Sequence, residues 1–258
     1  MAESFPISAV MICRNAEQTI AATLESLGRF SEVIVYDNGS TDRTVELARG
    51  FPNVSVHEGE FFGFGPTKNH AATLASNDWV FSIDSDERIS KELLESIVAA
   101  DLSSDKMAYS VHRANYLCGK LVRFSGWGND WLIRLYNRNA TGLTDAAVHE
   151  IVKPPVGGNV RKINGDLFHD AVRQLGDFLV KIDRYSEIQR EHSVRTLLPV
   201  LICLRSAWAF IRTYLLRLGF LDGWRGLIIA ICDANGVFFK YMKPYADHAV
   251  ALESRQVD

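Results

Sequence analysis

The sequence predicts an α/β protein with a mostly parallel sheet, followed by a helical C-terminal region. Short apolar runs rich in branched residues alternate four times with segments of helical spacing before residue 90. This alternation is typical of layered α/β domains. The runs that predict buried strands are Ile7–Cys13, Val33–Tyr36, Val54–Val56 and Trp79–Ile83.

Helical spacing fills the segments between these runs. It predicts helices over Glu17–Leu27, from Thr41, over Lys68–Ala75 and from near Ser90, and the Gly- and Phe-rich segment Gly59–Pro66 predicts a loop. Strand patterns end after about residue 170. The predicted helices beyond it are Phe178–Arg190, Leu197–Leu218 and Trp224–Met242. We therefore expect an α/β domain over residues 1–170 and a helical region over residues 171–258.

Composition narrows the class of protein. The chain has 258 residues, 47% of them hydrophobic, and a net charge of -3, which excludes a disordered chain and one that spans a membrane throughout. The α/β part is net acidic and could hold a metal ion, whereas the helical part is net basic and could face an anionic partner. The four cysteines form no CxxC pair and the N-terminus has no signal-peptide pattern, so we expect a reducing, cytoplasmic location.

Three polar clusters follow the predicted strands. They are Cys13–Asn15, Asp37–Ser40 and Asp84–Asp86. Ligands of α/β sheets bind beyond the carboxyl ends of the parallel strands. We therefore expect the three clusters to converge on one binding edge.

Asp84 and Asp86 predict a metal site. In extended backbone, residues i and i+2 project to the same side, and two carboxylates held that closely favour a neutralising cation. Oxygen ligands suit Mg²⁺ or Mn²⁺, which take further ligands from water and phosphates. The alternative is a solvated acidic turn in which Ser85 or Asp86 caps the next helix.

Other side chains suggest roles in binding and proton transfer. Asp37 could accept a hydrogen bond from a base or ribose, or simply hold a turn, and Lys68 could neutralise a phosphate or remain solvated. Asp130 or Glu150 could act as a general base. His149 could be a metal ligand, although a lone histidine is more often structural.

Ordered motifs resemble those of family 2 inverting glycosyltransferases, which have a GT-A fold. The first four are residues 8–17, residues 33–42, Lys68-Asn69 and residues 84–87, and residues 130–136 and 148–150 are similar too. Four further positions resemble one branch of this family, which adds glucose in β-1,4 linkage to the lipopolysaccharide inner core. They are His169, Lys181, Tyr185-Ser186 and residues 219–226.

The resemblance implies a reaction and a set of roles. The enzyme would transfer a hexose, with glucose as the implied sugar, from a UDP-sugar to a lipid-linked saccharide by a single metal-assisted displacement. Asp130 would be the base, with Glu150 as the alternative because the usual acidic pair is Asn129-Asp130 here. Asp86 and His149 would bind the metal. The implied donor site consists of Cys13, Asn15, Glu17, Asp37, Lys68, Asp84 and Ser85.

The sequence is also compatible with other functions. A nucleotidyl- or phosphotransferase also uses paired aspartates, but no GxxxxGK[ST] loop is present. The same fold could act on another polysaccharide or lipid acceptor, or bind sugar without catalysis. No nucleic-acid partner is expected, and oligomerisation stays open.

The segment Thr196–Phe220 predicts contact with a membrane surface. It contains three arginines and no acidic residue, beside an apolar stripe at three- and four-residue spacing. Such a helix can lie in the headgroup region of an anionic bilayer, peripheral to the cytoplasmic membrane. The alternative is that the stripe packs on the α/β domain or on another subunit.

Overall fold

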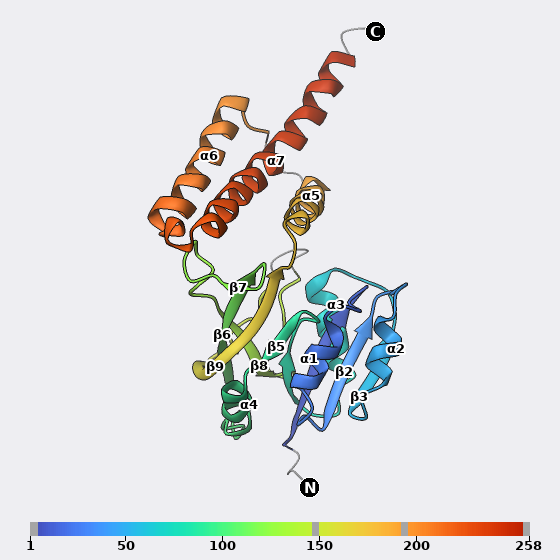
Figure 1. The fold of residues 1–258 in the computed structure, drawn as a ribbon. Coiled ribbons are helices and arrows are strands. Elements are labelled where there is room, and N and C mark those ends of the chain that lie inside the picture. Colours follow the sequence, from blue (N-terminus) through green and yellow to red (C-terminus); the bar gives the residue numbers. More distant parts are fainter. Residues whose placement is uncertain (1–4, 146–149, 192–195, 255–258) are drawn as a thin grey trace. The chain divides into compact units, whose positions relative to one another are not determined.

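The computed structural model describes residues 5–145, 150–191 and 196–254 (Figure 1). The chain forms two compact units. One comprises Met1–Ala114 and Asp130–His169, and the other comprises Asn115–Asn129 and Asp170–Asp258. The second unit therefore includes a segment that lies before residue 170, and the division into residues 1–170 and 171–258 stays a prediction.

A mixed sheet has the strand order β3-β2-β1-β4-β8-β6-β9-β5, with β7 paired to β6. The first four strands in the chain are parallel, and β8 runs antiparallel to β4. The strands are β1 Ile7–Cys13, β2 Glu32–Asp37, β3 Val54–Glu58, β4 Trp79–Ser82, β5 Glu87–Ile89, β6 Met107–Leu117, β7 Lys120–Leu121, β8 Trp131–Asn137 and β9 Asn159–Val172. The four predicted strands are thus confirmed, and β1 has the predicted bounds.

Helices accompany the parallel strands and form most of the second unit. In the first unit they are α1 Ile20–Ser26, α2 Thr44–Arg49, α3 Phe64–Thr73 and α4 Lys91–Val98. In the second they are α5 Leu175–Glu191, α6 Pro199–Ile211, the π-helical turn η1 Arg212–Leu216, the 3₁₀ turn η2 Gly219–Asp222 and α7 Trp224–Ser254. The predicted C-terminal helices are all present.

Strand β1 shows why the sheet is covered on both faces. Its alternate residues Ala9 and Met11 lie in one apolar cluster with residues of α1, α2 and α4. Val10 and Ile12 lie in a second cluster, with residues of α3. Both faces of the strand are therefore buried, which explains its continuous apolar run in the sequence.

Several helices begin at residues other than those predicted, with α1 at Ile20, α5 at Leu175 and α6 at Pro199. For α2 and α3 the structure gives the reason. Helix α2 begins at Thr44 and not at Thr41, since Asp42 Oδ1 accepts a hydrogen bond from Thr44 N at 3.0 Å. Helix α3 begins at Phe64, inside the predicted loop, after Gly63 turns the chain with φ of 101°. Pro66 does not prevent this, because a proline in the first helical turn removes no hydrogen bond. Helix α4 begins at Lys91, as expected from near Ser90, but its cap is Ser90 and not Ser85 or Asp86, since Ser90 Oγ accepts a hydrogen bond from Leu93 N at 3.1 Å.

Candidate active site

The loops that follow β1 and β2 are bound to each other by hydrogen bonds. Asn15, with φ of 53°, donates from its backbone N to Ser40 Oγ at 2.8 Å and accepts at Oδ1 from Thr41 N at 2.8 Å. Glu17 N donates to Asp42 Oδ2 at 3.2 Å. Two of the three predicted strand-end clusters therefore form one connected surface.

Asp37 organises the turn after β2. Its buried carboxylate accepts hydrogen bonds at Oδ2 from Gly39 N (3.0 Å) and Ser40 N (2.8 Å), and Gly39 has the positive φ that the turn requires. Cys13 Sγ lies 3.5 Å from Asp37 Oδ1. Burial, reinforced by the charge of Asp37, raises the pKa of the Cys13 thiol, which stays a neutral donor. The structure thus gives Asp37 the turn-forming role, and its contact with a nucleotide stays a prediction.

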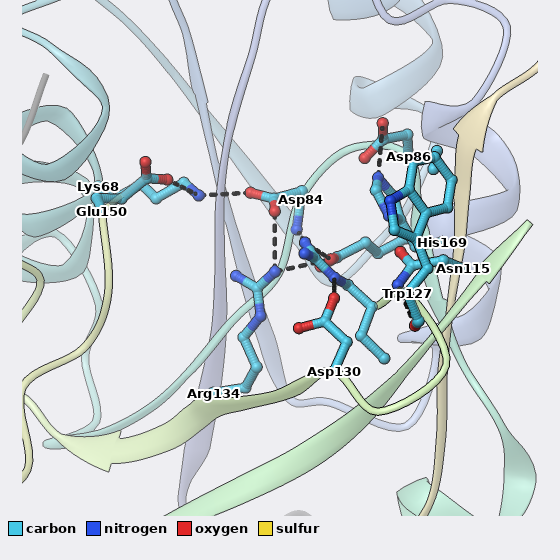
Figure 2. Close-up of polar contacts among 12 residues, drawn as sticks. Lys68, Asp84, Asp86, Asn115, Trp127, Asp130, Arg134, Glu150 and His169 are labelled. Atoms are coloured by element: carbon cyan, nitrogen blue, oxygen red, sulfur yellow. Dashed lines mark hydrogen bonds and ion pairs between the residues drawn. The ribbon is translucent and has the colours of Figure 1, made fainter. Parts of the chain in front are cut away.

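The third cluster, Asp84–Asp86, contributes Asp84 to a row of charged side chains that alternate in sign. We call this row the alternating network, and its members in order are Glu150, Lys68, Asp84, Arg134, Glu87, Arg113 and Asp130. Lys68 on α3 donates from Nζ to Glu150 Oε1 at 2.7 Å and pairs with Asp84 Oδ1 at 2.6 Å. Arg134 on β8 donates to Asp84 Oδ2 at 2.9 Å. Figure 2 shows Asp84 between the two cations. Asp84 is therefore committed to protein cations on both oxygens.

The alternating network continues from Arg134 to Asp130. Arg134 Nη2 also donates to Glu87 Oε1 at 2.7 Å. Glu87 Oε1 lies 3.6 Å from Arg113 Nη1, and Arg113 Nε donates to Asp130 Oδ2 at 2.8 Å. Four carboxylates and three cations thus alternate in sign from Glu150 to Asp130. Both predicted bases belong to one electrostatic unit.

Burial makes the pairing in the alternating network necessary. Lys68, Glu87 and Arg134 are buried, and buried charges are tolerated when they are paired and hydrogen-bonded. Burial alone would raise the pKa of Asp84, but Lys68 and Arg134 outweigh it and hold that pKa well below its ordinary value. Burial would lower the pKa of Lys68, but Asp84 and Glu150 leave it raised. Both groups therefore stay charged at neutral pH.

This geometry excludes one of the two alternatives for Lys68, that of a solvated lysine. The side chain is not solvated, and its ammonium group lies between two carboxylates. A direct contact with a donor phosphate stays a prediction, and it would have to compete with those two partners.

Asp86 is placed differently from Asp84. Its Oδ2 lies 3.6 Å from His169 Nε2, and the Asp86 side chain remains about one-third exposed (Figure 2). His169 comes from β9, where it lies opposite Glu87 in the antiparallel register of β5 and β9. Ser85, between the two aspartates, accepts from Thr23 Oγ1 at its carbonyl oxygen, which ties this turn to α1.

A metal site of three or more His, Cys, Asp or Glu side chains is not found among the described residues. The predicted ligand His149 lies outside those residues. Among the described residues, Asp86 and His169 form one pair of possible ligands for a cation.

Sequence reasoning missed three members of the alternating network, Glu87, Arg113 and Arg134. Arg134 carried a usable signal, because it interrupts the apolar strand segment between Ile133 and Leu135. A charge within a buried strand requires an opposite charge nearby. Which carboxylates would meet it depends on sheet register, which the local pattern does not give.

Comparison with known proteins identifies the family. Residues 8–150 match the model of glycosyl transferase family 2. The chain belongs to this family. The lipopolysaccharide core biosynthesis glycosyltransferase LpsC of Rhizobium meliloti is 32% identical over 270 residues, which cover 97% of this chain and 96% of that relative.

Other similarities are more distant or more partial. An uncharacterized glycosyltransferase of Rickettsia typhi is 27% identical over 97% of this chain and 89% of its own length. The structure of Staphylococcus aureus TarS 1-349 in complex with UDP-GlcNAc has a TM-score of 0.36 and 30% identity, covering 42% of this chain and 35% of that chain. This chain thus spans about a third of the TarS structure.

Family membership confirms the fold class and the enzyme class. The protein is a glycosyltransferase with a GT-A fold, built on a mixed, mostly parallel sheet and followed by C-terminal helices. The roles of the individual site residues stay predictions.

Proposed function

We propose that the enzyme transfers a hexose from a UDP-sugar to a lipid-linked saccharide such as the inner-core heptose of lipopolysaccharide, and that this hexose is glucose. The similarity to the lipopolysaccharide core glycosyltransferase of R. meliloti supports this acceptor class, because it extends over nearly the whole of both chains. Transfer to another polysaccharide or lipid acceptor is the alternative.

The observation that carries the proposed mechanism is the ion pair of Asp130 with Arg113. One oxygen of Asp130 receives the Arg113 Nε–H at 2.8 Å, which orients the carboxylate. Glu150 is the weaker candidate, since it is more buried and accepts a short hydrogen bond from Lys68. Asp130 would take the proton of the acceptor hydroxyl while the oxygen of that hydroxyl bonds to the anomeric carbon and the bond from this carbon to UDP breaks. This single displacement inverts the anomeric carbon.

Asp86, in the turn between β4 and β5, and His169, on β9, fit a divalent cation. A carboxylate oxygen of Asp86 and an imidazole nitrogen of His169 are 3.6 Å apart, against about 3 Å between neighbouring ligands of an octahedral ion, so a small shift of either side chain would let both bind one ion. Mg²⁺ commonly takes one or two protein ligands and completes its shell with water and phosphate oxygens. Mg²⁺ or Mn²⁺ held there would supply positive charge opposite the departing diphosphate. His149 is retained as a further proposed ligand.

The donor would lie against the connected loops after β1 and β2. We assign Cys13, Asn15, Glu17 and Asp37 to the nucleoside side. Lys68, Asp84 and Ser85 complete the proposed donor site. Asp84, whose two oxygens are bound to cations, would act mainly by positioning the turn that carries Asp86.

A non-catalytic sugar-binding module is less consistent with this geometry. Such a module needs neither a base nor a metal-binding pair, and the Asp130–Arg113 and Asp86–His169 pairs are both intact. A lipid-linked acceptor and a UDP-sugar donor also imply work at the cytoplasmic face of a membrane, which we propose as the location.

The decisive experiment measures UDP release with a panel of UDP-sugars, with and without a heptose-containing lipid acceptor. UDP-glucose should give metal-dependent, acceptor-dependent release and a β-linked product, identified by the anomeric coupling in its NMR spectrum. A retained α-linkage would overturn the inverting mechanism. Donor binding is followed separately as a metal-dependent rise in unfolding temperature, which should vanish in His169→Ala if His169 is a ligand.

A further inference from the structure

Helix α6 presents small and polar residues to its neighbour α7. Ile202, Ala209 and Thr213 are buried and lie seven and four residues apart, which places them on one face of the helix. On that face Ser206 Oγ donates to Ala234 O at 2.8 Å, and Thr213 Oγ1 donates to Asp233 Oδ2 at 2.7 Å. The side of α6 that contacts the protein is therefore less apolar than the side that faces away from it.

The large apolar side chains of α6 lie on the opposite face. Leu204 is 61% exposed and Trp208 is 55% exposed. We name this surface the outer face of α6 and η1, and it comprises Val200, Leu201, Leu204, Trp208, Ile211 and Leu215. A helix that packed only against its own protein would bury this stripe. A contiguous exposed apolar surface of this kind marks a contact with something else.

The turn from η1 to α7 extends the same apolar surface. Leu218, Phe220, Leu221 and Trp224 are all exposed there. The turn itself is tightly built, since a Cβ on Gly226 would lie 1.7 Å from a backbone oxygen of η2. These apolar side chains are thus presented by a fixed turn and not by a loose loop.

The charges around this surface are of one sign. Arg205 and Arg212 lie on α6 and η1 at the border of the outer face, and both are exposed. No acidic residue occurs between Thr196 and Leu221. Asp222, the next in sequence, accepts hydrogen bonds from the backbone N of Arg123 and of Phe124 and is not available to offset the arginines.

We propose that the outer face of α6 and η1, together with the turn to α7, binds in the plane of an anionic lipid bilayer. The apolar side chains would enter the boundary between headgroups and acyl chains, with Trp208 and Trp224 at the level where tryptophan is enriched in membrane proteins. Arg205 and Arg212 would extend to lipid phosphates. This binding is independent of the proposed sugar transfer, because it requires neither donor nor acceptor.

Charge favours a bilayer over a second copy of the chain. A symmetric contact through this surface would bring the arginines of both copies to one interface that holds no acid within the segment. A spanning helix is also disfavoured. Pro199–Leu216 is long and apolar enough to cross a membrane, the one such segment among the described residues. However, α6 packs along α7 (Figure 1), and α7 would carry Asp233, Lys240 and Lys243 into hydrocarbon.

The test is flotation of the full chain with vesicles of phosphatidylcholine alone or with about 30% phosphatidylglycerol. The protein should bind the anionic vesicles, and the bound fraction should fall between about 50 mM and about 500 mM salt. Two double variants, Arg205→Glu/Arg212→Glu and Leu204→Ser/Trp208→Ser, should each weaken binding at least about tenfold.

Matched controls separate this surface from general charge and general apolarity. Arg29→Glu/Lys91→Glu makes the same charge change at exposed positions of the first unit, and Leu179→Ser/Val180→Ser removes exposed apolar groups from α5. Both should bind as the wild type does, with unchanged circular dichroism in all variants.

Three results would overturn the proposal. They are absence of wild-type binding to anionic vesicles, equal binding to neutral vesicles, and binding that resists both salt and alkaline carbonate. Loss of a dimer in Leu204→Ser/Trp208→Ser, measured by light scattering, without any vesicle binding would assign the surface to a second copy.

Discussion

The two units of the molecule handle side-chain polarity in opposite ways. The first unit buries charges, among them Lys68, Glu87 and Arg134. The second unit exposes large apolar side chains, with Leu204 and Trp208 on α6 more than half accessible. Each arrangement is unfavourable for folding when considered alone. A buried charge needs a partner to offset its loss of hydration, and apolar surface left exposed to water does not contribute the free energy that its burial would. Each is therefore a sign of function.

The difference lies in where the compensation comes from. In the first unit the chain itself supplies it. Lys68, Glu87 and Arg134 meet opposite charges within the alternating network, and the buried Asp37 accepts hydrogen bonds from the backbone of its own turn. In the second unit the described residues do not cover the outer face of α6 and η1. We expect variants of the first unit to alter catalysis or folding, and variants of the outer face to alter binding.

The largest effect is expected at Asp86, the aspartate of the Asp84–Asp86 pair that lies 3.6 Å from His169. Asp86→Ala should lower kcat by about three orders of magnitude or more, because the charge opposite the leaving diphosphate is lost. Radiolabelled transfer measures it, and Asp105→Ala, at an exposed position, is the control. Full activity of Asp86→Ala, or of the wild type in excess chelator, would disprove the metal role.

Asp130→Asn should reduce kcat by about 10²–10⁴-fold and leave UDP-sugar binding unchanged, because a general base acts on the acceptor. Donor binding is measured by calorimetry in the same protein. Glu150→Gln is the paired variant. If Glu150→Gln is inactive while Asp130→Asn turns over, the two roles must be exchanged.

Lys68→Met tests the cost of a buried charge. It leaves Asp84 and Glu150 without their shared cation, and breaking a buried pair typically lowers the free energy of unfolding by about 3–5 kcal/mol. Arg43→Met breaks the exposed pair with Glu46 and should cost at most about 1 kcal/mol. Urea denaturation measures both, and equal effects would contradict the distinction between buried and surface pairs.

The pH dependence of stability should report Asp84. Its pKa in the folded state lies below its ordinary value, so the stabilisation by its charge is fully present above the unfolded pKa of about 3.9 and is lost as pH falls below it. The difference in unfolding free energy between wild type and Asp84→Asn should therefore be constant from about pH 5 to 7 and shrink only in stronger acid. A difference that already falls near pH 6 would assign it to another group.

The smallest effect on folding is expected on the outer face of α6 and η1. Leu204→Ser should change the free energy of unfolding by no more than about 0.5 kcal/mol, because the side chain is mostly exposed. Ile202→Ala, two residues away and buried against α7, should cost about 2–5 kcal/mol. Thermal denaturation compares the two. A large loss in Leu204→Ser would mean that the stripe packs against protein.

Much of the fold could be predicted from local pattern. The run Ile7–Cys13 is confirmed as β1 because a strand buried on both faces must be apolar throughout. The start of α2 was displaced to Thr44, since the side chain of Asp42 binds Thr44 N and this competes with an earlier helix start.

The site was predictable only to the level of which loops converge. The sequence predicts that Asp84 and Asp86 follow a strand. It does not predict that Asp84 pairs with Arg134 whereas Asp86 lies near His169. Arg134 and His169 reach them from β8 and β9, and the register of strands so distant in the chain is a tertiary property.

The alternation of charge from Glu150 to Asp130 has an evolutionary consequence. Because each interior member satisfies two neighbours, replacing one residue unbalances both sides, and a single neutral substitution at Arg134 leaves Asp84 and Glu87 repelling each other. Homologous enzymes should therefore change these positions in concert, as paired replacements that restore neutrality, or keep them all. Sequence covariation among the seven positions would make that constraint visible without a further structure.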